Sequence, residues 1–258
     1  MIDTHCHLTD ERLSRQLPAV LERAAAAGVN RCITIGTDLA DSEAARVLSH
    51  AHPPVVFAAG IHPTYTRPYT PTDVERLRPL LADERCVALG EIGLDHYWKD
   101  VPREHQRAMF IAQLALAAET GKPVILHSRE AVDDTLAVLR EFPAVPAVFH
   151  CFGGSVEQAR AVVEAGYYIG LDGPLTYRNA AVVRAVAAAV PADRLLLETD
   201  CPYLTPEPHR SAGVKVNEPA YVRAVAEALA AVRGCTLDDI DQQTTDNALR
   251  LFGPAVGA

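Results

Sequence analysis

The chain has 258 residues and a formal net charge of −9, with 49% hydrophobic and 22% charged residues. This length suits one large domain or two small ones, and it allows a core that needs no disulfides. The negative charge argues against a protein that coats duplex nucleic acid by bulk electrostatics. A nucleic-acid enzyme remains possible, because a bound divalent metal can supply positive charge locally.

The six cysteines include no C-x-x-C pair, and reduced thiols of a cytosolic protein are the default interpretation. The chain opens MIDTHCHL, without the basic and apolar regions of a signal peptide. No apolar stretch is long enough to cross a bilayer as a helix. We therefore expect a cytoplasmic protein without a membrane partner, and we expect it to be a monomer.

Short aliphatic runs alternate along the chain with amphipathic helical patterns. The predicted strands are residues 2–5, 32–35, 55–60, 87–91, 124–127, 147–150, 167–171 and 195–198. The predicted helices are residues 19–27, 72–81, 107–119, 133–141, 156–165 and 180–189. Such alternation implies parallel strands with helical crossovers. Eight strands predict a closed (β/α)8 TIM barrel, a single domain over residues 1–258.

Helix ends carry recognisable capping residues. Asp133 and Ser155 are predicted N-caps, and Gly28, Gly121 and Gly166 are predicted C-caps.

A doubly wound open sheet is the alternative fold, but the first strand–helix turn lacks the G-x-G-x-x-G of a dinucleotide fold. The proline-rich segment 202–219 follows the eighth strand and is a candidate active-site loop. Beyond it, Asn217 is the predicted N-cap of a helix that begins at Glu218 and Pro219.

Side chains that can bind metal gather at the carboxyl ends of the predicted strands. They end the first, fourth, fifth and sixth strands or follow the eighth, and they are His5, His7, Glu91, His127, His150 and Asp200. In a barrel these strand ends converge on one mouth, where such enzymes keep their chemistry. Residues far apart in the sequence are thus predicted to become neighbours.

The donor types predict a pair of divalent ions. His5 and His7 are two residues apart in a strand, so both side chains lie on one face. Imidazole and carboxylate together suit Zn²⁺, Mn²⁺ or other divalent ions. Four histidines and two carboxylates exceed what one ion needs, so Glu91 could bridge two ions about 3.5–4 Å apart. An H-x-H alone often has a structural role, but burying Glu91 without a cation would be costly.

The motifs resemble those of the TatD family of metal-dependent deoxyribonucleases, within the amidohydrolase superfamily. They run in order across almost the whole chain: IDTHCHL (2–8), GIHP (60–63), GEIGLDHY (90–97), PVILHSR (123–129), HCFGG (150–154), LLETDCPYL (196–204) and NEPAYV (217–222). Many superfamily members place a carbamylated lysine at strand four, where this chain has Glu91, as in the TatD family. Thr9 departs from the family, which commonly has Asp there, and this departure affects a contact behind the metal ligands rather than a metal ligand itself.

The resemblance implies the role of each site residue. One metal would be held by His5, His7 and Asp200, and the second by His127 and His150. Glu91 would bridge the two ions, which would be Mg²⁺, Mn²⁺ or Zn²⁺. The catalytic residues would be Asp200, which orients the attacking water and takes its proton, and the bridging Glu91. His62 and Arg129 are candidates for contacts to the phosphate of the substrate.

The implied reaction is hydrolysis of DNA phosphodiester bonds by a 3′–5′ exodeoxyribonuclease acting on single-stranded or damaged DNA. The residues alone predict only a metal-dependent hydrolase, since the same metal pair would activate water towards a small-molecule amide, lactone or ester. A non-catalytic metal-binding scaffold is a third hypothesis. Tyr97 and Trp98 follow the fourth strand, and they either stack on a base or pack within their loop.

Overall fold

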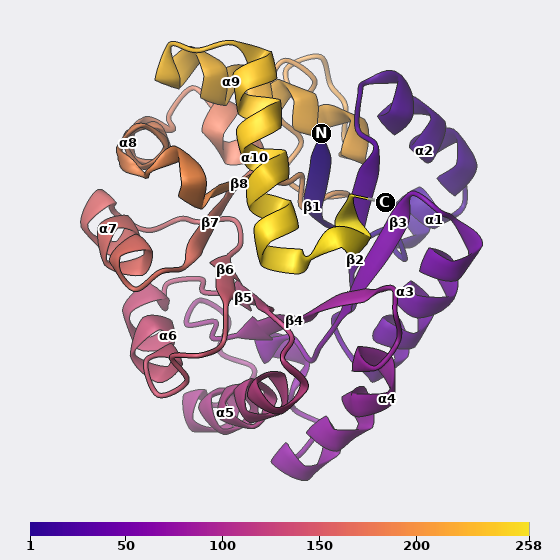
Figure 1. Cartoon of the computed structure of the whole chain (residues 1–258), viewed down its shortest axis with the longest axis vertical. Helices are drawn as coiled ribbons and strands as arrows, with labels where there is room; N and C mark the ends of the chain where they lie inside the picture. Colours follow the sequence, from indigo (N-terminus) through magenta and orange to yellow (C-terminus); the bar gives the residue numbers. More distant parts are fainter. Residues whose placement is uncertain (258) are drawn as a thin grey trace.

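Eight parallel strands form a barrel in the computed structural model, which describes residues 1–257 (Figure 1). The strands lie side by side in the order in which they occur in the chain. They are β1 (Ile2–Cys6), β2 (Arg31–Ile35), β3 (Val55–Ala59), β4 (Cys86–Gly93), β5 (Val124–His127), β6 (Ala147–Phe149), β7 (Tyr168–Leu171) and β8 (Leu195–Leu197). All eight predicted strands are confirmed.

The barrel closes where β8 meets β1. The Thr4 hydroxyl donates a hydrogen bond to the carbonyl of Leu197 (3.0 Å), and Cys6 and Cys201 form a parallel bridge. These contacts join the last strand to the first, as a barrel requires. The TIM-barrel prediction is therefore confirmed, and the open doubly wound sheet is excluded.

Helices surround the barrel (Figure 1). The α-helices are α1 (Glu11–Ser14), α2 (Leu17–Ala26), α3 (Leu39–Ala51), α4 (Arg78–Leu81), α5 (Arg103–Thr120), α6 (Val132–Leu139), α7 (Val156–Glu164), α8 (Ala181–Ala189), α9 (Val222–Arg233) and α10 (Leu237–Phe252). The 3₁₀ helices are η1 (Pro63–Tyr65), η2 (Pro71–Leu77), η3 (Gly173–Thr176), η4 (Ala192–Arg194), η5 (Pro219–Tyr221) and η6 (Pro254–Val256). No helix among residues 1–257 is both long and apolar enough to cross a membrane.

Some helix predictions need correction. The predicted helix over residues 72–81 is mostly the 3₁₀ helix η2, and only its last turn is α-helical, because Pro79 lacks the N–H that a continuous α-helix would use at this position. The helix α5 begins at Arg103, one turn before the predicted start. The segments of α1, α3 and α10 are helices that the sequence pattern does not predict, and for α9 it predicts only a start near Pro219.

The caps are confirmed in part. Ser155 caps α7, accepting a hydrogen bond from the backbone of Gln158. Asp133 is not the N-cap of α6, because Ala131 takes that position and Asp133 lies in the first turn. There it accepts a hydrogen bond from the Gln158 side chain (2.9 Å). Asn217 was also wrong as a cap, since Glu218 precedes η5.

The three predicted C-terminal glycines have positive φ. Gly121 is the C-cap of α5, with φ of 68°, whereas Gly28 and Gly166 follow the C-cap residues of α2 and α7. A left-handed backbone at a helix end is the conformation that glycine adopts at least cost.

Two apolar cores lie on the two sides of the sheet. The outer core fills the space between the strands and the surrounding helices. The inner core lies within the barrel and includes Ile33, Ile35 and Leu196, together with Leu251 and Phe252 of α10. The helix α10 crosses one end of the barrel (Figure 1), so this end is covered and the opposite end stays open.

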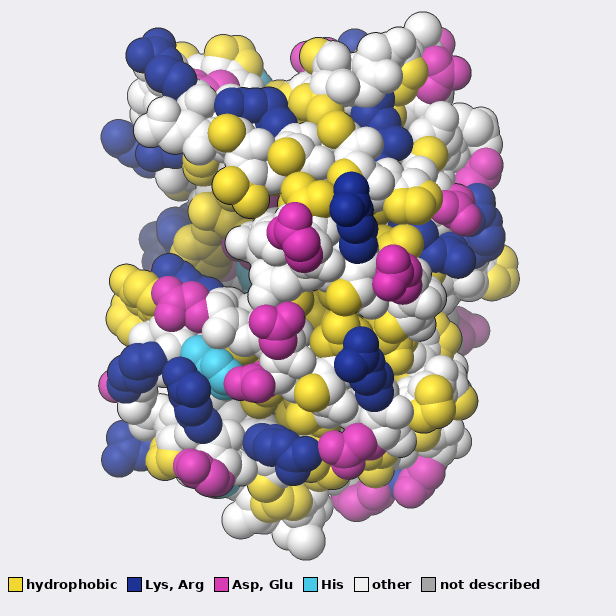
Figure 2. Space-filling view, turned by 90° about the vertical axis from the view of Figure 1, so that its left-hand side faces the viewer, with side chains coloured by type: hydrophobic (Ala, Val, Ile, Leu, Met, Phe, Trp, Pro, Cys, Tyr) yellow, Lys and Arg dark blue, Asp and Glu magenta, His cyan; other side chains and the backbone are white. Residues whose placement is uncertain are grey.

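The surface over α6, α7 and α8 mixes charges of both signs (Figure 2). Basic and acidic side chains alternate on this face, with scattered apolar groups between them. Mixed charge of this kind is typical of a surface that is exposed to water. The side chains predicted to bind metal lie elsewhere, around a cavity at the open end of the barrel.

Candidate metal centre

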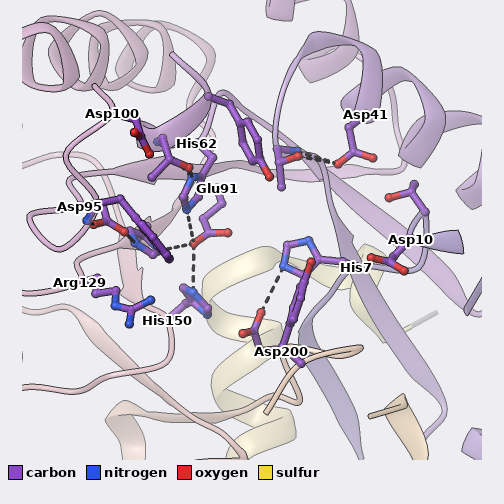
Figure 3. A pocket seen from close by; sticks show the side chains of 17 residues that line it. His7, Asp10, Asp41, His62, Glu91, Asp95, Asp100, Arg129, His150 and Asp200 are labelled. Atoms are coloured by element: carbon purple, nitrogen blue, oxygen red, sulfur yellow. Dashed lines mark hydrogen bonds and ion pairs between the residues drawn. The ribbon is translucent and has the colours of Figure 1, made fainter. Parts of the chain in front are cut away.

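The predicted site residues meet at the open end of the barrel. They come from β1, β4 and β5 or from the segments that follow β1, β3, β5, β6 and β8, and they are His5, His7, His62, Glu91, His127, Arg129, His150 and Asp200. All of them except His5 line one cavity of about 840 Å³, and Figure 3 shows their side chains converging there. His5 lies beneath the others and is fully buried.

The first group of possible metal ligands, here called the first donor group, consists of His5, His7 and Asp200. It joins β1 to the segment after β8. The His7 Nε2 lies 3.2 Å from the Asp200 Oδ1, and the His5 Nε2 lies 3.7 Å from the same oxygen. The Asp200 amide donates to the carbonyl of His5 (2.9 Å), and the His7 amide to that of Cys201 (2.7 Å). Asp200 itself has φ of 54°, a left-handed conformation that non-glycine residues rarely adopt outside functional sites. Barrel closure thus places Asp200 against both histidines.

The second donor group surrounds Glu91, at the centre of Figure 3. The Glu91 Oε1 lies 2.8 Å from the His127 Nδ1, 3.0 Å from the His150 Nε2 and 3.6 Å from the His62 Nε2. Its other oxygen, Oε2, lies 3.5 Å from the His5 Nε2. One carboxylate therefore faces both donor groups, with a different oxygen towards each.

The local sequence explains where Glu91 lies. The strand β4 continues to Gly93, so Glu91 lies within the strand and not at its end as predicted. Gly93 has φ of 135°, and a Cβ there would overlap the carbonyl oxygen of His127. That oxygen accepts a hydrogen bond from the Leu94 amide (3.1 Å). A glycine two residues after Glu91 thus lets β4 approach β5 closely enough to bring Glu91 beside His127.

Burial and neighbouring charges shift the pKa values of Glu91 and His150 in opposite directions. Burial would raise the pKa of Glu91, but His150, His62 and His127 hold it well below its usual value. Burial would lower the pKa of His150, but Glu91 and Glu198 raise it well above its usual value. His62 is different, because burial lowers its pKa to about 3 and leaves the imidazole neutral at pH 7. Glu91 is thus ionised at pH 7, and the imidazoles around it stabilise its negative charge.

The residues fit a divalent metal. Both ring nitrogens of His5 are buried, and within residues 1–257 neither has a hydrogen-bond partner. A buried polar atom without a partner is costly unless something absent from the protein chain, such as an ion, satisfies it. Imidazole nitrogens and carboxylate oxygens lie within 4.8 Å of one another in the set His5, His7 and Asp200 and in the set His62, Glu91 and His127. This donor chemistry is that of divalent metal centres.

Two carboxylates that are not predicted from the sequence lie behind the histidines. The Asp95 Oδ2 lies 2.8 Å from the His127 Nε2, and the Glu198 Oε1 lies 3.3 Å from the His150 Nδ1 without hydrogen-bond geometry. Both carboxylates are 1% exposed. Such partners fix the orientation of ligating histidines. The signal that identified Glu91, an acidic residue at the end of an apolar strand, also applies to Glu198.

Asp3 and Asp172 are two more buried acids near the mouth. Asp3 accepts hydrogen bonds from the amide (2.9 Å) and hydroxyl (2.6 Å) of Thr199, which fixes the backbone just before Asp200. Asp172 directly follows β7, and burial together with Glu198 raises its pKa well above its usual value. The pKa of Asp172 is thus shifted upwards, whereas the pKa of Glu91 is shifted downwards.

His62 and Arg129 differ in their surroundings. His62 lies within the histidine cluster, and its Nδ1 contacts Thr64 (2.8 Å). Arg129 lies at the rim, where its guanidinium stacks 3.9 Å above the Tyr97 ring. Among residues 1–257 no carboxylate forms an ion pair with Arg129. Arg129 is therefore a free cation at the mouth, whereas His62 borders the carboxylate.

Comparison with known proteins identifies relatives over nearly the full length. The family model described as "TatD related DNase" matches residues 2–253. YcfH of Escherichia coli strain K12, named an uncharacterized metal-dependent hydrolase, is 43% identical over 257 residues, covering 98% of this chain and 95% of the relative. The protein named 3′-5′ ssDNA/RNA exonuclease TatD of Edwardsiella piscicida is 39% identical, covering 98% of this chain and 99% of that protein.

A solved structure agrees with this comparison. The crystal structure of YJJV, a TatD homolog from Escherichia coli K12, superimposes with a TM-score of 0.92. The two chains are 34% identical, and the match covers 98% of this chain and 97% of the other. Sequence and structure thus give the same relationship over the whole barrel.

Proposed function

Because this chain belongs to the family of TatD-related DNases and is a metal-dependent hydrolase of ester bonds, we propose that it is a 3′–5′ exonuclease acting on single-stranded DNA. The relative from Edwardsiella piscicida carries the name of such an exonuclease and supports this substrate. All proposed ligands come from one chain, so we also propose that the monomer is the active unit.

We propose two divalent ions, with Mg²⁺, Mn²⁺ and Zn²⁺ as candidates. His5, His7 and Asp200 would hold one ion, His127 and His150 the other, and Glu91 would bridge them. The observation that carries this proposal is the position of Glu91, whose Oε2 faces His5 and whose Oε1 faces His127 and His150. A single ion would not use both sets of donors.

The surrounding residues would carry the reaction. When bound, divalent ions lower the pKa of water and offset charge on the phosphate. Asp200 would orient the attacking water and take its proton, since its carboxylate is ionised and lies at the cavity wall. Burial would raise the pKa of Asp200, but His7 and His150 hold it low. Arg129, free of an ion pair, would bind the phosphate, and neutral His62 would contact it from the histidine cluster.

The test is a nuclease assay on purified protein. Labelled single-stranded DNA and a panel of cyclic amides and lactones would each be incubated with Mg²⁺, Mn²⁺ or Zn²⁺ in turn. We expect mononucleotides to be released from the 3′ end, no release in a chelator, and recovery when metal is added back. The variant Asp200→Asn should bind DNA without cleaving it. Hydrolysis of a lactone or amide with intact DNA would favour the small-molecule hydrolase, and cleavage in the chelator would refute the metal scheme.

A further inference from the structure

Exposed aromatic rings gather around the mouth of the barrel. Among residues 1–257 the large hydrophobic side chains that are most exposed include Tyr65 (54%), Tyr97 (45%), Trp98 (51%) and Tyr203 (48%). Tyr65, Trp98 and Tyr203 line the metal-site cavity itself. Aromatic rings left in water at one cavity are typical of a binding surface rather than of a solvated exterior.

The loop that carries Trp98 is held rigidly. The Asp95 Oδ1 accepts hydrogen bonds from the amides of Tyr97 and Trp98, both at 2.8 Å. The Gln106 side chain from α5 bonds to both the amide (2.8 Å) and the carbonyl (3.0 Å) of Asp95. Because the other Asp95 oxygen contacts His127, one buried carboxylate fixes both a proposed metal ligand and the backbone of Trp98. The exposure of the Trp98 ring therefore does not result from a poorly fixed loop.

Trp98 is half exposed and has a cation nearby. Arg129 covers the Tyr97 ring at 3.9 Å and lies 6.0 Å from the Trp98 ring. The Tyr97 and Trp98 rings are perpendicular, with centroids 5.0 Å apart, so they meet edge to face and do not stack in parallel, and Trp98 keeps 51% of its surface exposed. The indole thus stays half exposed in the cavity, beside a guanidinium without an ion pair.

We propose that Trp98 is a stacking platform for an unpaired nucleobase whose backbone phosphate is bound by Arg129. This proposal rests on the proposed nuclease function and names the residue that would select single strands. Every base has a π-face, whereas a base within a duplex has both faces covered by its neighbours. Trp98 would therefore favour strand ends and unpaired segments, and its contribution would depend little on the sequence of the DNA.

The chain supplies its own probe, because Trp98 is its only tryptophan. We would titrate the metal-loaded protein with a short phosphorothioate oligothymidylate, which resists hydrolysis, and follow the fluorescence of Trp98. The matched ligand is an abasic phosphorothioate of the same length and charge. We expect the thymidylate to quench the fluorescence and the abasic strand to bind about tenfold more weakly, with little quenching.

Variants extend the test through the anisotropy of labelled strands. Trp98→Ala should weaken thymidylate binding about tenfold and leave the affinity for the abasic strand unchanged. Trp98→Phe should restore most of that affinity, and Val182→Ala, at an exposed residue outside the cavity lining, is the control. Unchanged thymidylate binding in Trp98→Ala, or equal binding of both strands by the wild type, would overturn the proposal.

These readouts do not depend on turnover. If the wild-type protein cleaved DNA while Trp98→Ala bound thymidylate normally, the platform would be refuted and the nuclease would stand. If quenching and the effect of Trp98→Ala were present but no phosphodiester were cleaved, the nuclease would be refuted and the platform would stand.

Discussion

The two ends of the barrel use the same strands for opposite purposes. At the end covered by α10, the interior is apolar, and Leu251 and Phe252 pack against aliphatic strand residues such as Ile33. At the open end, the strands lead into five histidines that face Glu91 or Asp200. The covered end contributes free energy of folding through apolar burial, whereas the open end buries charge at a cost that a ligand must offset.

This contrast teaches where to expect stability and where to expect activity. Substitutions at the covered end should lower the free energy of unfolding and leave the chemistry alone. Substitutions at the open end should remove activity or metal and leave the fold in place. The following variants test whether stability depends on the covered end of the barrel and activity on the open end.

The largest effect is expected from Glu91→Gln. A neutral amide cannot serve both donor groups as a bridging carboxylate, so we expect DNA cleavage to fall about 10³-fold or more. The circular dichroism spectrum should match that of the wild type. Glu84→Gln, just before the other end of the same strand, is the control and should retain full activity. Wild-type cleavage by Glu91→Gln with added metal would refute the bridging role.

The second variant, Phe252→Ala, tests the covered end. Phe252 is 6% exposed within the inner core, and its truncation leaves a cavity. We expect the free energy of unfolding to fall by about 3–5 kcal/mol, measured by urea denaturation. The kcat/KM for DNA at 25 °C should be unchanged where the variant remains folded. A large loss of kcat/KM without a loss of stability would contradict the separation of the two ends.

A smaller effect is expected from Glu198→Gln. The Glu198 carboxylate lies behind His150, and removing its charge should loosen that imidazole. We expect metal affinity to weaken about 10- to 100-fold, measured by calorimetric titration of Mn²⁺ into chelator-treated protein. Glu157→Gln, at an exposed site on α7, should bind as the wild type does. Equal affinities in all three proteins would exclude an orienting role for Glu198.

The smallest effect is expected from Thr236→Ala. Thr236 is the N-cap of α10, and its hydroxyl accepts a hydrogen bond from the Asp239 amide (3.1 Å). Loss of this cap should lower the free energy of unfolding by about 1 kcal/mol and leave DNA cleavage unchanged. Thr236→Ser keeps the hydroxyl and should show most of the wild-type stability. Reduced cleavage in Thr236→Ala would mean that α10 influences the open end.

The sequence predicted the strands well because most of them are short aliphatic runs that are buried on both sides. Helices were less predictable. The helix α10 carries polar residues such as Asp241 and Gln242 along much of its length, and its position over the barrel depends on long-range packing. Pro71 and Pro79 changed a predicted α-helix into a 3₁₀ helix that continues as one α-helical turn.

The candidate site, like the fold, was predictable only in part from the sequence. Topology alone was enough to bring Glu91 and Asp200 to the same mouth, because strand ends converge in a barrel. The role of Asp95 was not predictable, since it depends on the distances from its two oxygens to His127 and to the loop amides. The residues next to Asp95 in the sequence do not indicate these distances.

The most direct test of the metal centre is anomalous diffraction from crystals grown with Mn²⁺. We predict two peaks at the open end of the barrel, one beside His5, His7 and Asp200 and the other beside His127 and His150, with the Glu91 carboxylate between them. A map with no peak within reach of Glu91, or with manganese bound only elsewhere on the protein, would contradict the account.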